Sequence, residues 1–64
     1  MIDIHVLVPK KELDTIKIME GDDFIIVSFV TSYNKNTSFI RVLTTEEVMV
    51  FLSIKYGQQN VWKR

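Results

Sequence analysis

The sequence predicts a small α+β domain: an antiparallel sheet of three to four strands with one C-terminal helix packed on one face. Three observations predict this fold. Residues 2–8 alternate as a strand does, residues 24–44 hold two β-branched segments around a polar turn, and residues 45–56 hold a helix with marked ends. The 64 residues suffice for one core only, so residues 1–64 form a single domain.

Residues 2–8 (IDIHVLV) form the first expected strand, because large apolar side chains recur at every second position. One face of this strand carries Ile2, Ile4, Val6 and Val8. The other face carries Asp3, His5 and Leu7. Pro9 ends the strand, since proline has no N–H to donate to a neighbouring strand.

Residues 9–20 fit two interpretations. Apolar residues at helical spacing, between a proline and a glycine, indicate a helix. The letters TIKIM also alternate, and the turn residues EGDD would join them to the next strand as a hairpin. We favour the second interpretation, with a turn or a single helical turn over residues 9–14 and a strand over residues 15–20.

The next two segments predict a β-hairpin. Residues 24–30 (FIIVSFV) are rich in β-branched and aromatic residues, which favour strands. The polar turn YNKN follows at residues 33–36, where asparagine tolerates left-handed backbone angles. Residues 37–44 (TSFIRVLT) form the second strand, so the hairpin extends from Asp23 to Thr44.

A helix over Thr45–Tyr56 is the best-specified element. Thr44 stands three residues before Glu47, which is the spacing of a capping box. In that motif the threonine side chain accepts from the N–H of residue 47, and the glutamate reaches back to the N–H of residue 44. Gly57 is the left-handed residue expected just past the C-terminal end. Residues 60–64 (NVWKR) either form a short edge strand or fray.

The chain has more apolar surface than one helix on one sheet face needs. The helix stripe that can pack on the sheet consists of Val48, Met49, Leu52 and Tyr56. Two further sets lie away from that contact: Val50, Phe51 and Ile54 on the helix, and Ile25, Val27 and Phe29 on the second face of the strand at 24–30. We predict that the interaction surface is one of these two sets, either the three helix residues or the three residues of the strand.

Three explanations account for this surplus. Residues 1–20 fold over the second sheet face, two copies of the chain pack together, or the surface is kept for another protein. Burial of six such side chains contributes on the order of 10 kcal/mol before ordering costs. That is as large as the whole stability of a typical domain. We therefore expect the surface to be covered, and we favour a homodimer.

Composition restricts the remaining functions. The eight basic and eight acidic residues balance, so the basic excess that indicates nucleic-acid binding is absent. There is no cysteine for a disulfide, and one histidine cannot supply a structural zinc site. No segment has the roughly 18 consecutive apolar residues that cross a bilayer, and the N-terminus lacks the basic region of a signal peptide. We expect a cytoplasmic protein that binds no membrane, metal or cofactor.

No group of residues indicates catalysis. His5 has one acidic neighbour on its strand face, Asp3, and a lone histidine beside an acid is typical of a surface. The acidic cluster at residues 20–23 lacks the ligand spacing of a calcium loop. Residues 32–38 (SYNKNTS) contain no glycine for a phosphate loop. We expect no enzyme and no small-molecule substrate.

The alternative function is that of a small nucleic-acid-binding regulator. Aromatic side chains beside cations stack on bases and hold phosphates. The residues that would act in this way are Lys10, Lys11, Lys35, Arg41, Trp62, Lys63 and Arg64. We rank this alternative lower, because the sequence does not indicate that these residues share a face.

Residues 22–57 (DDFIIVSFVTSYNKNTSFIRVLTTEEVMVFLSIKYG) resemble the small accessory proteins encoded by bacteriophages in their size and order of elements. That resemblance implies a protein that binds and inhibits one host protein, in the host cytoplasm. The order of three strands and a helix also resembles double-stranded-RNA-binding domains. Their final helix begins with a lysine-rich motif, whereas this helix begins TTEE, which argues against RNA binding. We predict a non-enzymatic protein-interaction module, a homodimer that inhibits or regulates a larger protein.

Overall fold

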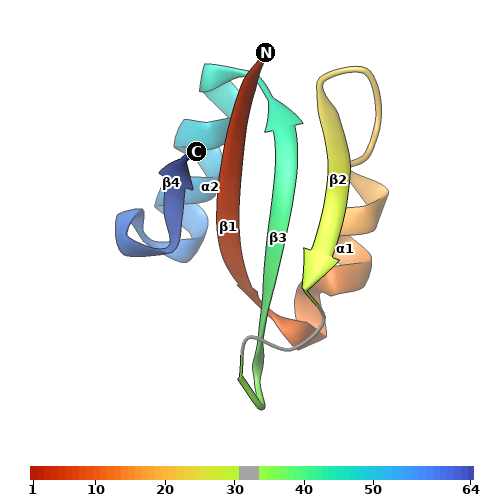
Figure 1. The fold of residues 1–64 in the computed structure, drawn as a ribbon, viewed down its shortest axis with the longest axis vertical. Helices are drawn as coiled ribbons and strands as arrows, with labels where there is room; N and C mark the ends of the chain where they lie inside the picture. Colours follow the sequence, from red (N-terminus) through yellow and green to blue (C-terminus); the bar gives the residue numbers. More distant parts are fainter. Residues whose placement is uncertain (31–33) are drawn as a thin grey trace.

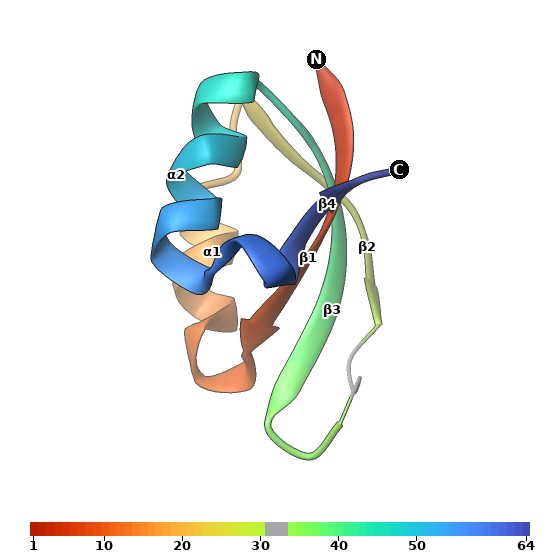
Figure 2. The same cartoon turned by 90° about the vertical axis from the view of Figure 1, so that its left-hand side faces the viewer.

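The computed structural model describes residues 1–30 and 34–64, and it shows an α+β fold with a four-stranded antiparallel sheet in the order β2-β3-β1-β4. Figure 1 shows the sheet in front of the two helices, and Figure 2 shows that both helices lie on the same side of it. The elements are β1 (Ile2–Pro9), η1 (Lys10–Glu12), α1 (Leu13–Ile18), β2 (Phe24–Val30), β3 (Thr37–Thr44), α2 (Glu46–Tyr56), η2 (Gln58–Asn60) and β4 (Val61–Lys63).

The pairing of β1 with β3 forms the centre of the sheet. It extends from Ile2 opposite Thr44 to Pro9 opposite Thr37. The predicted alternation of β1 is confirmed, because its even-numbered side chains from residue 4 onward are fully buried under the helices. The core joins β1 and β3 to both helices, and its fully buried apolar members are Ile4, Val6, Val8, Ile16, Ile40, Val42 and Leu52.

The prediction of a strand over residues 15–20 is wrong. Residues Leu13–Ile18 form α1, which lies behind β2 in Figure 1. The physical reason is that α2 packs against β1 and β4 and leaves the rest of the sheet face uncovered. A helix formed by residues 13–18 covers that part of the face. Ile16 enters the core completely, with Leu13 and Met19 packed against that core at helical spacing. The sequence of this segment fits both helical spacing and strand alternation, and packing against the sheet selects the helix.

The hairpin of β2 and β3 is confirmed, and it contains a β-bulge that the alternation did not predict. Ile26 lies opposite Val42 and Ser28 lies opposite Arg41, so Val27 is the extra residue. In the turn, Asn34 accepts at Oδ1 from the N–H of Asn36 at 2.9 Å. Tyr33, the first residue of the predicted turn, lies outside the described residues.

The free edge of β2 is closed by its own chain. Glu20 accepts at Oε2 from the N–H of Ile26 at 3.1 Å, in the segment just before the strand. Because β2 has a neighbour on one side only, this N–H points away from the sheet. The carboxylate of Glu20 therefore occupies the position that a further strand would take.

The predicted helix over residues 45–56 is confirmed as α2, but the capping residue is Thr45 rather than Thr44. The Thr45 hydroxyl oxygen accepts from the N–H of Val48 at 3.2 Å. Thr44 is the last residue of β3, and its buried hydroxyl donates to the carbonyl of Asp23. The predicted capping box of Thr44 and Glu47 is therefore wrong: α2 has a simple threonine N-cap, and the Thr44 side chain bonds within the hairpin instead.

The C-terminal end of α2 is also as expected, with a positive φ of 97° at Gly57. A side chain at this position would meet the Gln59 side chain at 2.9 Å. Within residues 60–64, Val61–Lys63 form β4, so of the two alternatives for this segment the structure has the short edge strand. It pairs with residues 4–6 of β1 only.

Two residues of α2 provide a matched test of this packing. Leu52→Ala should lower the free energy of unfolding by about 2–5 kcal/mol, because it opens a cavity in the core. Ile54→Ala should change it by no more than about 0.5 kcal/mol, since Ile54 is 80% exposed. Urea unfolding at low protein concentration measures both. Equal losses at the two positions would show that α2 is packed on a different face.

Candidate functional site

The outer side of α2 carries an exposed apolar surface, which we call the α2 stripe, consisting of Val50, Phe51 and Ile54. Their exposed fractions are 50%, 51% and 80%. Leu52 enters the core on the opposite side, and at 100° per residue the three stripe residues point away from the sheet. The structure therefore brings together these three predicted interaction residues on one surface.

The α2 stripe continues into a groove between α2 and β4. Val50 and Ile54 form one wall of this groove, and Val61 and Trp62 form the other. At the helix start, Lys63 donates to Glu46 at 3.1 Å, so this lysine is engaged by the helix. Of the predicted nucleic-acid contacts, Trp62 lines the same groove as Lys63.

The other three predicted interaction residues do not share a face, and that part of the prediction is wrong. Ile25 pairs with Leu43 on the side of the sheet away from the helices. After the bulge the alternation reverses, so Phe29 pairs with Ile40 on the helix side. Lys17 of α1 lies 5.5 Å from the centre of the Phe29 ring, which agrees with this position. The side chain of Val30 lies outside the described residues.

The sheet has one face away from the helices, which we call the open face. The explanation that residues 1–20 cover this face is wrong, since β1 is within the sheet and α1 lies on the same side of the sheet as α2 (Figure 2). The strand pairing places alternate residues of each strand on it: Asp3, His5, Leu7, Ile25, Phe39, Arg41, Leu43 and Trp62. Their backbone is fixed by the same register that forms the core.

Among the described residues, the rings of His5, Phe39 and Trp62 form an aromatic cluster on the open face. The His5 ring centre lies 4.6 Å from that of Phe39 and 6.3 Å from that of Trp62. The Phe39 and Trp62 ring centres are 5.6 Å apart. The rings come from β1, β3 and β4, and β1 lies between the other two. The sequence places His5 on the face of its strand opposite the core but does not indicate that the three rings meet.

An ion-pair group borders the aromatic cluster. Arg41 donates from Nε and Nη2 to the Asp3 carboxylate, at 3.1 Å and 2.7 Å. Nη1 of Arg64 lies 3.6 Å from the same carboxylate. The hydrogen bonds from Arg41 hold the pKa of Asp3 below its usual value and raise the pKa of Arg41. His5 therefore has no catalytic acid partner in Asp3, whose oxygens are held by arginine.

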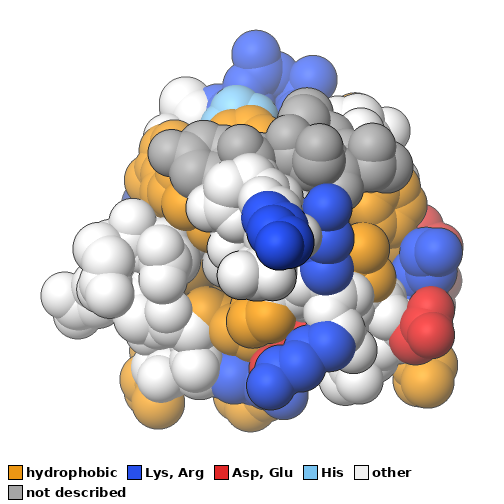
Figure 3. Space-filling model, turned by 90° about the horizontal axis from the view of Figure 1, so that it is seen from below, with side chains coloured by type: hydrophobic (Ala, Val, Ile, Leu, Met, Phe, Trp, Pro, Cys, Tyr) orange, Lys and Arg blue, Asp and Glu red, His pale blue; other side chains and the backbone are white. Residues whose placement is uncertain are grey.

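Three of the predicted basic residues meet at the end of the molecule where β1 leaves the sheet. Lys10, Lys11 and Lys35 line one hollow together with Asn36, and the N–H of Lys10 donates to the carbonyl of Asn36 at 2.9 Å. Figure 3 looks at this end, and basic side chains lie near its middle. The structure thus divides the predicted nucleic-acid contacts: this lysine group lies at one end, Arg41 and Arg64 lie beside Asp3, and Trp62 and Lys63 line the groove between α2 and β4.

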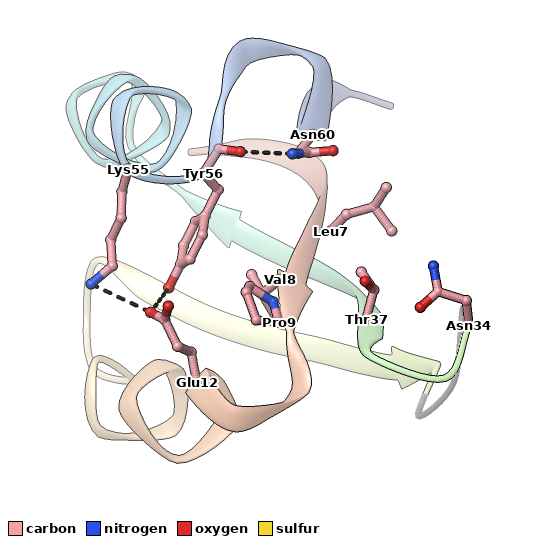
Figure 4. Close-up of a pocket in the computed structure, with 9 residues that line it drawn as sticks. All are labelled: Leu7, Val8, Pro9, Glu12, Asn34, Thr37, Lys55, Tyr56 and Asn60. Atoms are coloured by element: carbon pink, nitrogen blue, oxygen red, sulfur yellow. Dashed lines mark hydrogen bonds and ion pairs between the residues drawn. The ribbon is translucent and has the colours of Figure 1, made fainter.

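A pocket beside β1 lies between α2 and η1 (Figure 4). Side chains at the end of α2 contact η1 across it. The Tyr56 hydroxyl donates to Glu12 at 2.9 Å, and Lys55 lies 3.6 Å from the same oxygen. Burial and the neighbouring carboxylate raise the pKa of Tyr56, so its phenol remains protonated and acts as a donor. This arrangement holds the helix end in place rather than activating a nucleophile.

Within residues 1–30 and 34–64, no group of three or more His, Cys, Asp or Glu residues is arranged to hold a metal ion. No helix in that part of the chain is long and apolar enough to cross a membrane. Comparison with protein-family models, with curated proteins and with solved structures finds no match. The function must therefore be argued from the surfaces alone.

The ion pair of Asp3 predicts a pH dependence of stability. The folded-state pKa of Asp3 lies below the ordinary value of 3.8, so its stabilising effect is present above that pH and is lost as the pH falls through the folded-state value. The difference in unfolding free energy between the wild type and Asp3→Asn should be constant above about pH 5 and shrink below about pH 4. Urea unfolding from pH 2 to 7 measures it. A difference that does not vary with pH would contradict this role of Asp3.

Proposed function

We propose that this protein is a non-enzymatic protein-interaction module that binds through the α2 stripe and forms a homodimer. The observation that carries the proposal is the exposure of Val50, Phe51 and Ile54 on one helix surface. The core is complete without them, since Leu52 and its neighbours fill the space between α2 and the sheet. Contiguous apolar surface that folding does not use is typical of interaction sites.

Burial of the α2 stripe provides a free energy comparable with the cost of association. Full burial of one such side chain stabilises a complex by about 1.5–3 kcal/mol. The exposed fractions of 50%, 51% and 80% together correspond to about two fully exposed side chains in each copy. Their burial is the stabilisation available to a complex. Association costs about 4 kcal/mol or more, so a surface of this size supports a weak dimer whose population depends on concentration.

The charges of α2 favour a second copy in the antiparallel direction. Glu46 and Glu47 lie in the first turn of the helix, and Lys55 lies in the last turn. When two α2 helices pack antiparallel about a twofold axis near Phe51, Glu47 of one copy faces Lys55 of the other, which also lies 3.6 Å from Glu12 of its own copy. The helix dipoles are then also antiparallel. A larger protein that presents an apolar groove would compete for the same surface.

The oligomeric state tests this proposal. The mass measured by light scattering should rise from 7.5 kDa towards twice that value as the concentration increases from about 1 µM to about 1 mM. Ile54→Glu should remain at 7.5 kDa at all concentrations, with an unchanged circular dichroism spectrum, because Ile54 is 80% exposed.

Ile25→Glu is the matched control, since Ile25 is 41% exposed on the other side of the sheet. It should form dimers as the wild type does. Loss of the dimer in Ile25→Glu but not in Ile54→Glu would place the interface on the open face instead. A wild type that stays monomeric at 1 mM would show that the α2 stripe does not bind a second copy.

A further inference from the structure

The outer edge of β4 is open, whereas the opposite edge of the sheet is closed. At the β2 edge, Gly21 and Phe24 exchange backbone hydrogen bonds of 3.0 Å and 3.4 Å. Glu20 accepts from the N–H of Ile26 on the same edge at 3.1 Å. Within residues 1–30 and 34–64, no strand lies beyond β4, which forms the left-hand edge of the sheet in Figure 1. Because unpaired backbone groups at a sheet edge bind other strands, this edge is a position where a further strand can add.

The register of β4 shows which of its backbone groups point outward. The N–H of Arg64 donates to the carbonyl of Asp3 in β1 at 3.0 Å. Hydrogen-bonded residues alternate with non-bonded ones along an antiparallel ladder, so Trp62 is the next residue bonded to β1. The backbone N–H and C=O groups of Val61 and Lys63 therefore point away from β1.

Most of these outward groups are unpaired in the sheet. The N–H of Val61 donates to the carbonyl of Gln58, so η2 uses this group. In the part of the chain that the structure describes, no strand faces the C=O of Val61 or the N–H and C=O of Lys63. A row of donor and acceptor groups at this spacing is complementary to the backbone of another extended chain.

An apolar groove lies beside this row. Val50 and Ile54 of α2 form one wall of the groove, and β4 forms the other. The side chains of Val61 and Lys63 lie on the helix side of the sheet, since Val61 enters the core and Lys63 contacts Glu46 of α2. Residues directly opposite one another on neighbouring strands have side chains on the same face. The residues of an added strand that pair with Val61 and Lys63 therefore direct their side chains towards α2, into the groove.

From this arrangement we infer that the β4 edge binds an extended peptide segment of another protein, which adds one strand to the sheet. Two side chains of the segment, two residues apart, enter the groove between α2 and β4. They are apolar, because Val50 and Ile54 are 50% and 80% exposed. The lysine of the groove, Lys63, is already paired with Glu46 at 3.1 Å. The strand contact gives affinity through the backbone, and the groove gives selectivity through alternate side chains.

This inference does not rest on the homodimer. Val50 and Ile54 belong to both the α2 stripe and the groove, so a second copy and the peptide segment compete for them. Phe51 belongs to the α2 stripe only, and the row of backbone groups on β4 belongs to the groove only. Substitution of Phe51 therefore separates the two kinds of binding.

Hydrogen exchange at Lys63 provides a direct readout. The probe is a peptide of about eight residues in which valine alternates with threonine, acetylated and amidated at its ends. At about 1 mM peptide and about 50 µM protein, exchange of the Lys63 N–H measured by NMR should slow about fivefold, because this group gains a hydrogen bond. That change corresponds to a Kd of about 0.25 mM. Exchange of the Trp62 N–H, which is bonded to β1, should change less than about twofold.

Methylated peptides test whether the backbone makes the contact. Methylation of the valine nitrogens removes the N–H groups that face β4 and places methyl groups against the strand, but it keeps the apolar side chains. The Lys63 N–H should then no longer be protected. Methylation of the threonine nitrogens, which face away from the sheet, should leave the protection unchanged.

Two substitutions on α2 separate the groove from the α2 stripe. Ile54→Glu puts a carboxylate in the groove and should weaken peptide binding at least about tenfold. Phe51→Glu is the matched control, since Phe51 is 51% exposed on the same helix but does not line the groove. It should bind the peptide as the wild type does, although it should lose the homodimer. Circular dichroism checks that both variants fold.

Three results would overturn the inference. They are unchanged Lys63 exchange at about 1 mM peptide, equal protection by the peptide methylated at valine, and equal losses of binding in Ile54→Glu and Phe51→Glu. Slower Lys63 exchange on raising the protein concentration without peptide would also overturn it, since a second copy would then occupy the edge. A wild type that stays monomeric but shows the protection would support the inference and contradict the homodimer.

Discussion

The antiparallel pairing of β1 with β3 is the contact on which the rest of the structure depends. It joins segments about 35 residues apart and sets both faces of the sheet at once. A shift of one residue would move every core side chain of a strand to the opposite face. In the observed register Val6 meets Ile40 in the core, and Leu7 meets Phe39 on the open face. The open face and the hydrophobic core therefore have the same structural cause.

The sequence predicts the secondary structure correctly where the apolar residues follow one repeat. It does not decide the structure of a segment that fits both the helical and the strand repeat. β1, the hairpin and α2 are present where the sequence predicts them, although α2 is capped by Thr45 rather than Thr44 and the hairpin contains a bulge. Residues 13–18 fit both a helix and a strand. They form a helix because part of the sheet is not covered by α2, and Ile16 packs there in the core. Two adjacent threonines offered two start points for α2, and the hairpin's need for the Thr44 hydroxyl decided between them.

The candidate surfaces were predictable to different degrees for the same reason. The α2 stripe depends on helical geometry within 11 residues, so its outward direction follows from local spacing. Phe29 was misplaced because the bulge at Val27 carries no glycine or other sequence signal. The aromatic cluster needs the strand order, which brings residues 5, 39 and 62 together. Alternation gives the face of each residue but not its neighbour in the sheet.

The hydrogen bond from Ile26 to Glu20 has a consequence for how copies of this chain can grow into larger structures. With the bulge, it leaves the β2 edge without the regular row of backbone groups that templates fibre growth. At the other edge, β4 is only three residues long. Strand addition, the route to open-ended polymers, is thus blocked at the β2 edge and limited to a short segment at the β4 edge. The exposed apolar side chains of this chain are therefore not accompanied by a long, regular strand edge.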